Sequence, residues 1–381
     1  MSVAELLEGR RICVCGGSGG VGKTTTAAAI AIGMAAAGAR VAVVTIDPAR
    51  RLADAFGLSE LGNEPALVSR ELFAAAGIEM QGELWAMMLD PKRTFDDLVG
   101  RLAPTAQARD EVLSNRIYRE ISNAVAGTQE YTAIAKLHQL HEDGGFDLIV
   151  LDTPPSRNAL DFLDAPDRLT QFFEGRALQV FLRPTGLAGR VVGRGGGLIF
   201  SLLGRVTGVD VLGDVSNFLR AFGGMIDGFR DRARRVNELL RDPATTFLLV
   251  TSPEREPVDE AIFFWRKLRE ASMPYGGTIV NRVHHDYAGD EDPSTIADEL
   301  SGTLGKELAG RVADNFRDYH VLARRDAGNI ERLANTLDER RMLLVPQFDE
   351  DVHDLAGLRR MHGFLFASGD ERRRMLDDVV A

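Results

Sequence analysis

A glycine-rich loop follows the first apolar run of this chain and restricts the fold more than any other feature. The run occupies residues 11–15 (RICVC), the loop is GGSGGVGKTT at 16–25, and an alanine-rich stretch continues to Gly38. A continuous apolar run of this length is typical of a buried parallel strand, and an alanine-rich stretch that ends at glycine is typical of a helix. A second apolar run at 41–46 completes a strand, helix, strand unit.

Further apolar runs of strand length lie at 83–90, 147–151, 246–250, 276–280 and 341–345. Strands that alternate with helices predict an α/β fold with a doubly wound, mostly parallel sheet. The strand pattern fades at 91–145 and 156–243, where helical spacing replaces it. We therefore expect residues 1–381 to form one domain, to which helical insertions at 91–145 and 156–243 add a subdomain.

The glycine loop fits two phosphate-binding patterns. Gly17, Gly19 and Gly22 match G-x-G-x-x-G, the dinucleotide pattern, and Asp47 follows the next strand, where a ribose-binding acid would lie. Residues 17–24 also match G-x-x-x-x-G-K-[ST], the P-loop pattern, in which the lysine contacts the β- and γ-phosphates. We favour the P-loop interpretation, because a lysine at a helix N-terminus opposes the helix dipole unless a phosphate lies there.

The P-loop predicts which residues meet a nucleotide. Backbone N–H groups and the lysine would hold the phosphates, while a hydroxyl and a strand-end carboxylate would hold Mg²⁺. We expect the magnesium ligands to be Thr24 and Asp152, the latter at the end of the run 147–151. The expected phosphate-binding residues are Gly17, Gly19, Gly20, Val21, Gly22, Lys23, Thr24 and Thr25.

Composition argues against several other classes of protein. A formal net charge of -11 and a pI near 5.3 argue against nucleic-acid binding. Cys13 and Cys15 are the only cysteines, too few for a disulfide framework or a zinc site within one chain. The sequence has no uncharged apolar run long enough for a transmembrane span and no apolar core of a signal peptide. We expect a cytoplasmic protein, with peripheral membrane contact as an option.

Five parts of the chain resemble a family of ATPases that includes arsenite-pump ATPases and the ATPases that target tail-anchored membrane proteins, also described as anion-transporting ATPases. These parts are GGVGKTTTAAAIAIGMAAAG, VVTIDPARRLADAFG, VLDTPPSRNALDFL, TSPEREPVDEA with TIVNRV, and VPQFDEDVHDLAGL. The resemblance implies a dimeric, Mg²⁺-dependent ATPase with a P-loop of the deviant Walker A type. It also implies that Asp47 positions the attacking water, that Lys23 acts beside it in catalysis, and that Asn281 reads the adenine of ATP.

Three departures from the family pattern stand out. The second switch, D-T-A-P-T-G-H in the family, is DTPPSRN at 152–158, and the zinc-binding cysteine pair of the targeting enzymes is absent. Ser18 replaces a lysine that in the family reaches across the dimer to the partner's nucleotide. Serine cannot supply that charge, which leaves three options. In a homodimer, Arg50 or Arg51 would replace the lysine, and in a heterodimer a lysine-bearing paralogous ATPase would supply it. In the third option the chain binds ATP and hydrolyses it slowly. We favour the heterodimer.

The helical insertions would carry a client in such an ATPase. The resemblance leaves open a hydrophobic or membrane-protein segment, a metalloid oxyanion and a cytosolic protein, although a metalloid is disfavoured without a cysteine triad. A glycine-rich stretch at 176–209 carries five arginines and no acid, which favours either a surface loop or a cationic, apolar contact surface. The alternative on the same loop is a P-loop kinase or ligase that acts on a small metabolite.

Overall fold

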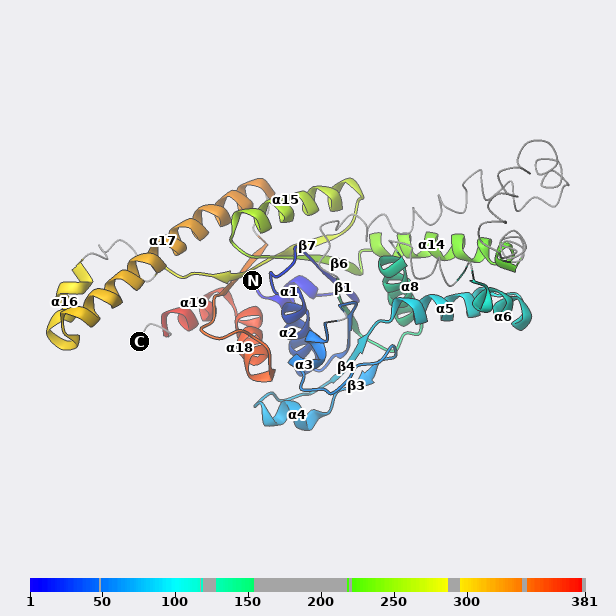
Figure 1. Ribbon diagram of the computed structural model, residues 1–381, viewed down its shortest axis with the longest axis horizontal. Helices are drawn as coiled ribbons and strands as arrows, with labels where there is room; N and C mark the ends of the chain where they lie inside the picture. The colour runs from blue at the N-terminus through cyan, green and yellow to red at the C-terminus, as the bar shows by residue number, and fades with distance from the viewer. Residues whose placement is uncertain are drawn as a thin grey trace, which may run out of the picture. The chain divides into compact units, whose positions relative to one another are not determined.

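The computed structural model describes residues 1–47, 49–116, 118, 128–153, 218, 221–286, 295–337 and 341–378 (Figure 1). The chain divides into two compact units. The sheet unit comprises Met1–Met88, Asp143–Ala159 and Arg241–Ala381, and the helical unit comprises Leu89–Glu142 and Leu160–Leu240. The chain leaves the sheet unit twice to form the helical unit. It leaves after residue 88 and returns at 143, and it leaves again after 159 and returns at 241.

The sheet unit is built on eight strands in the order β3-β4-β2-β5-β1-β6-β7-β8. Every neighbouring pair is parallel except β3 and β4. This arrangement confirms the predicted doubly wound, mostly parallel α/β fold. The strands are β1 Ile12–Gly16, β2 Arg40–Thr45, β3 Ala66–Leu67, β4 Glu83–Met88, β5 Leu148–Asp152, β6 Thr245–Thr251, β7 Tyr275–Val283 and β8 Met342–Pro346.

Helices cover both faces of this sheet. Figure 1 shows α2 and α18 on one side of the strands and α15 and α17 on the other. Neighbouring residues of a strand point to opposite faces of the sheet. On β7, Ile279 packs with the core formed with α2 and α18, whereas Val280 packs with the core formed with α15 and α17. The helices of the sheet unit are α1 Val3–Leu7, α2 Lys23–Ala36, α3 Arg51–Ala55, α4 Arg70–Ala75, α15 Arg255–Glu270, α16 Ile296–Leu304, α17 Lys306–Leu337, α18 Leu355–Phe366 and α19 Gly369–Asp378.

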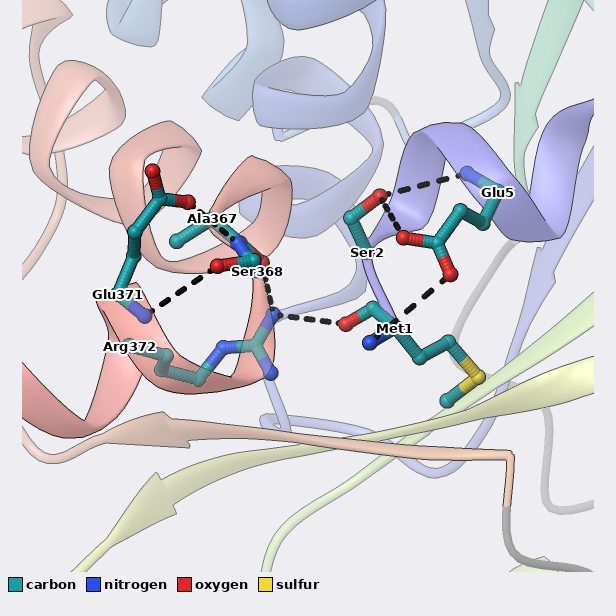
Figure 2. Close-up of polar contacts among 7 residues, drawn as sticks. All are labelled: Met1, Ser2, Glu5, Ala367, Ser368, Glu371 and Arg372. Carbon is teal, nitrogen blue, oxygen red and sulfur yellow. Dashed lines mark hydrogen bonds and ion pairs between the residues drawn. The ribbon is translucent and has the colours of Figure 1, made fainter.

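The last helices of the sheet unit are tied to its first helix (Figure 2). The Arg372 guanidinium on α19 donates to the Met1 carbonyl at 3.3 Å and to the Ala367 carbonyl at 2.8 Å. Ser368 and Glu371 cap the start of α19 reciprocally, each backbone N–H donating to the other side chain. These contacts fix α18, whose apolar face packs against α2, the helix that begins at the glycine loop.

The helical unit has an aromatic core of its own. The ring of Phe95 lies 6.0 Å from that of Tyr118 and 5.7 Å from that of Phe229, and the Phe222 ring lies 5.2 Å from those of Phe218 and Phe229. The Tyr118 hydroxyl donates to Asp96 at 2.6 Å, which satisfies the polar end of a buried ring. The described helices here are α5 Pro91–Leu102, α6 Ala106–Ser114, α8 Thr128–Glu142 and α14 Ile226–Arg241.

Part of the predicted insertions lies outside the described residues. The arginine-rich stretch at 176–209 and residues 154–158 of the second switch fall there. The role of the insertions at 91–145 and 156–243 as a client subdomain therefore stays a prediction. Within the described part of the chain, no helix combines the length and apolar character needed to cross a bilayer.

Candidate active site

A cavity of about 420 Å³ opens where the parallel strands of the sheet unit end. The cavity is lined by Lys23, Thr24 and Thr25 at the start of α2, by Asn281 of β7, and by the segment after β8. Ligands of doubly wound sheets bind at the carboxyl ends of the strands, and this cavity has that location. Its lining is mostly polar and includes the apolar side chains of Phe348 and of Met361.

At Gly17 and Gly22 the glycine loop passes so close to its neighbours that a side chain would not fit. A Cβ atom at Gly17 would lie 1.9 Å from the Val250 carbonyl oxygen on β6, so the loop runs directly against that strand. Gly22 has a φ of 92° and precedes α2 as its N-cap without any side-chain cap. The first N–H groups of an α-helix have no partner within the helix, so this helix start can bind an anion.

Gly22→Ala should lower ATP affinity about tenfold and reduce stability by about 1–2 kcal/mol, the cost of a left-handed non-glycine residue. Its Cβ would lie 2.4 Å from Asn281 Nδ2, so the loop and Asn281 would have to move apart. Gly38→Ala is the matched control, because Gly38 also has a positive φ of 106° but open space around its Cβ. Gly22→Ala should lose at least as much stability as the control in urea unfolding, and equal ATP affinity of the two variants in calorimetry would contradict the steric argument.

Lys23 is buried at this helix start. Its Nζ donates to the Ser18 carbonyl oxygen at 2.7 Å, and burial, the largest influence, lowers the pKa of the ammonium. A γ-phosphate would supply the anion that offsets the burial of this charge. The Ser18 hydroxyl is buried and has no hydrogen-bond partner among the described residues, and Ser18 does not line the cavity.

Asp152 is the most deeply buried acid beside the loop. Its Oδ2 accepts hydrogen bonds from the hydroxyls of Thr24 at 2.7 Å and Thr45 at 2.8 Å. Burial raises the pKa of this carboxyl to about 6, although both hydroxyls and Lys23 favour the carboxylate. Its Oδ1 is buried without a partner in the described structure. A threonine hydroxyl and an incompletely bonded carboxylate are hard oxygen ligands, so this group fits Mg²⁺.

Asp47 lines the cavity and follows the end of β2. Its Oδ1 accepts the Ala49 N–H at 2.9 Å, and its Oδ2 lies 3.8 Å from the Arg51 guanidinium. The first of these contacts is the turn expected of an aspartate after a strand, and the second oxygen remains available to a ligand. Arg51 lines the cavity with Asp47, whereas Arg50 does not.

Asn281 lines the cavity and bonds to the glycine loop. Its amide nitrogen donates to the Val21 carbonyl oxygen at 3.0 Å, and the side chain is buried. One donor of the amide is therefore used within the protein, which leaves a second N–H and the oxygen for a base. Beside it, Arg282 adopts a left-handed φ of 63° where the pairing of β7 with β8 shifts register.

The sequence profile of the family described as anion-transporting ATPases matches residues 10–325. The chain belongs to this family. It is 29% identical to ATPase GET3A of Arabidopsis thaliana over 73% of this chain and 67% of the relative. It is 25% identical to ATPase ASNA1 homolog 1 of Paramecium tetraurelia and 26% identical to ATPase get3 of Schizosaccharomyces japonicus, each over 81% of this chain and 84% of the relative.

Membership of the anion-transporting ATPase family settles the ambiguity of the glycine loop. The chain is an ATPase and binds ATP, so the dinucleotide interpretation was wrong. The family assignment agrees with a lysine buried at the start of α2, for which a dinucleotide fold has no use. It does not by itself assign a role to any side chain.

Most of the predicted site residues of this ATPase converge on the cavity. Those that line it are Gly20, Gly22, Lys23, Thr24, Thr25, Asp47 and Asn281, and Asp152 is reached through Thr24. Gly17, Gly19 and Val21 do not line it, although Gly17 and Val21 shape the loop through Val250 and Asn281. Two residues near the site were not predicted from the sequence motifs: Thr45, which is opposite Asp152 in the β2–β5 ladder, and Gln347 in the segment after β8.

Proposed function

We propose that this ATPase is a Mg²⁺-dependent switch in which ATP binding closes an assembly of two subunits and hydrolysis reopens it. The observation that supports the proposal best is the Thr24–Asp152–Thr45 arrangement, with an unpartnered carboxylate oxygen beside a buried lysine. Thr24 and Asp152 would hold Mg²⁺, which would neutralise charge on the phosphate oxygens.

The other side chains divide the work of binding and hydrolysis. The N–H groups at the start of α2 and the Lys23 ammonium would hold the phosphates and stabilise charge as it develops on the terminal group. Asp47, with one oxygen fixed by Ala49, would accept a hydrogen bond from the attacking water and orient it for in-line attack. Asn281, which lines the same cavity, would contact adenine.

Phosphate release and calorimetry test this proposal. With Mg²⁺, ATP should bind with measurable heat and release phosphate in buffer alone, and EDTA should remove most of the hydrolysis. Release that depends on an added small metabolite would instead favour the kinase or ligase alternative. No heat with any adenine nucleotide would overturn the proposed site.

Ser18 leads us to propose a heterodimer with a lysine-bearing paralogous ATPase. Lys23, Thr24, Asp47 and Asp152 are all in place, and the missing element is a cation that a partner subunit can supply. Co-purification with a second ATPase that raises phosphate release, lost when the partner's loop lysine becomes alanine, would support the heterodimer. A pure homodimer with the same rate as the mixed assembly would contradict it.

Arg51→Ala should reduce hydrolysis less than about fivefold if a partner supplies the missing cation. The Arg51 side chain is 63% exposed and lies 3.8 Å from Asp47, a geometry that contributes little as an ion pair. A cation that contacts the transferring phosphate contributes about 10³-fold or more. A loss of that size in single-turnover phosphate release by the pure chain would show that Arg51 replaces the lysine. Arg50→Ala, on a side chain outside the cavity, is the matched control.

We also propose that the helical unit holds the client of this switch. Support comes from its separate aromatic core and from the resemblance to ATPases that target tail-anchored proteins. Crosslinking of a hydrophobic tail-anchor peptide to the chain, with and without a non-hydrolysable ATP analogue, tests this role. Crosslinks confined to the sheet unit would contradict it.

A further inference from the structure

The strand that carries Asn281 continues into a segment held by α17. The backbone N–H of His284 donates to Asp326 Oδ2 at 3.1 Å, and the His284 Nδ1 lies 2.7 Å from the same oxygen. Asp326 Oδ1 accepts the guanidinium of its neighbour Arg325 at 2.8 Å. Asp326 is 0% exposed, so a carboxylate fully removed from water binds the chain three residues beyond Asn281.

We propose that Asp326 is a positioning residue for the nucleoside end of the site, acting through His284 on Asn281. This inference rests on the proposed contact between Asn281 and adenine. It assigns to α17, which does not line the nucleotide cavity, a share in the affinity for ATP.

The β-sheet alone does not fix this end of β7. Its pairing with β8 is regular through Val280, shifts register, and resumes at Val283, while Arg282 between them is left-handed. Such a bulge re-aims the side chains around it. Beyond the bulge, the Gln347 N–H donates to the Val283 carbonyl at 2.9 Å, and the next anchor is the pair of bonds from His284 to Asp326.

A largely apolar cavity of about 360 Å³ lies between α17 and the ends of β7 and β8, lined by Val283, Ala323, Ile330 and Leu344 among others. The His284 ring also packs edge-on against that of Tyr319 on α17, 5.1 Å between centroids, and His320 of α17 bonds Asp286 at 2.8 Å. The link to Asp326 is the one among these contacts that holds both the backbone and the side chain of His284. A shift of Asn281 would disturb both its bond to Val21 and its contact with a base.

The test compares nucleotide with triphosphate that has no base. Asp326→Asn should raise the KM for ATP about tenfold with kcat within about twofold, while inhibition by inorganic triphosphate stays unchanged. His284→Gln should act in the same direction and serves as the milder variant if Asp326→Asn fails to fold. Arg332→Ala is the matched control, because Arg332 also lies on α17 and pairs with Asp259 at 2.6 Å, away from β7.

A double-variant cycle identifies the route of the effect. If Asp326 acts through Asn281, adding Asp326→Asn to Asn281→Ala should raise KM no further. Equal weakening of ATP and inorganic triphosphate, or full additivity in the cycle, would overturn the inference. If Asn281→Ala itself leaves the ratio of ATP affinity to triphosphate affinity unchanged, the proposed contact between Asn281 and adenine is wrong. This result distinguishes failure of that contact from failure of the positioning role of Asp326.

Discussion

Asp47→Asn should slow ATP hydrolysis by about 10³-fold, within the range for loss of a positioned base, and change ATP affinity less than about threefold. Asparagine keeps the shape of the side chain and an oxygen that can accept the Ala49 N–H, so the turn after β2 should survive. What the variant removes is the carboxylate oxygen that faces the cavity beside Lys23. The expected loss therefore concerns orientation of the attacking water and spares binding of the phosphates.

Single-turnover phosphate release and calorimetry with ATP separate these two quantities. Asp54→Asn is the matched control, because Asp54 lies on α3, the helix that follows the Asp47 turn, and is exposed. The control should keep hydrolysis within about twofold, as expected for an exposed carboxylate outside the cavity. An Asp47→Asn variant that retains hydrolysis but loses affinity would assign Asp47 to binding.

Asp152→Asn should make the nucleotide-free protein more stable while reducing hydrolysis at least about 10²-fold. Burial raises the pKa of Asp152 from its ordinary 3.8 to about 6, so the folded state binds the proton more tightly than the unfolded chain does. Ionisation above pH 6 then opposes folding by up to about 3 kcal/mol. Asparagine carries no charge and so avoids this cost, but its amide N–H groups then need hydrogen-bond acceptors at a buried position. The net gain in the free energy of unfolding should therefore be about 1–2 kcal/mol.

The stability difference should depend on pH in one direction. At pH 8 the variant should unfold at higher urea than the wild type, and the difference should shrink as pH falls through about 6, where the wild-type carboxyl regains its proton. Urea unfolding in EDTA at pH 8 and pH 5 measures this. Asp147→Asn is the control, since that exposed residue bonds the Arg40 N–H at the opposite end of the same strands. A variant that is less stable at pH 8 would show that the carboxylate stabilises the apo fold.

The sheet could be predicted because its strands are buried on both faces. Continuous apolar runs such as 147–151 differ from their surroundings, and the observed strands begin and end within three residues of the predicted runs. The strand β3 was missed because both of its residues are exposed and two residues carry no periodicity. Its pairing with β4 depends on tertiary contact that local sequence does not encode.

Site residues could be predicted where the spacing of residues in the sequence determines where their side chains lie. The pattern around Lys23 and Thr24 places both side chains at one helix start, and Asp152 follows from its place at a strand end. Thr45 could not be found in this way, since its partnership with Asp152 depends on the β2–β5 register between residues 107 positions apart. The Asp326 link to His284 joins a helix interior to a strand end, for which no spacing rule exists.

The strand order also governs how this protein can emerge from the ribosome. β1 pairs with β5 and β6 and not with β2, which follows it in the chain. An apolar strand and the loop after it therefore leave the exit tunnel with no sheet partner until residues 148–152 have been translated. Nascent chains of this ATPase should need protection by a holding chaperone over that interval, and the cavity cannot be complete before β7 and β8 are synthesised.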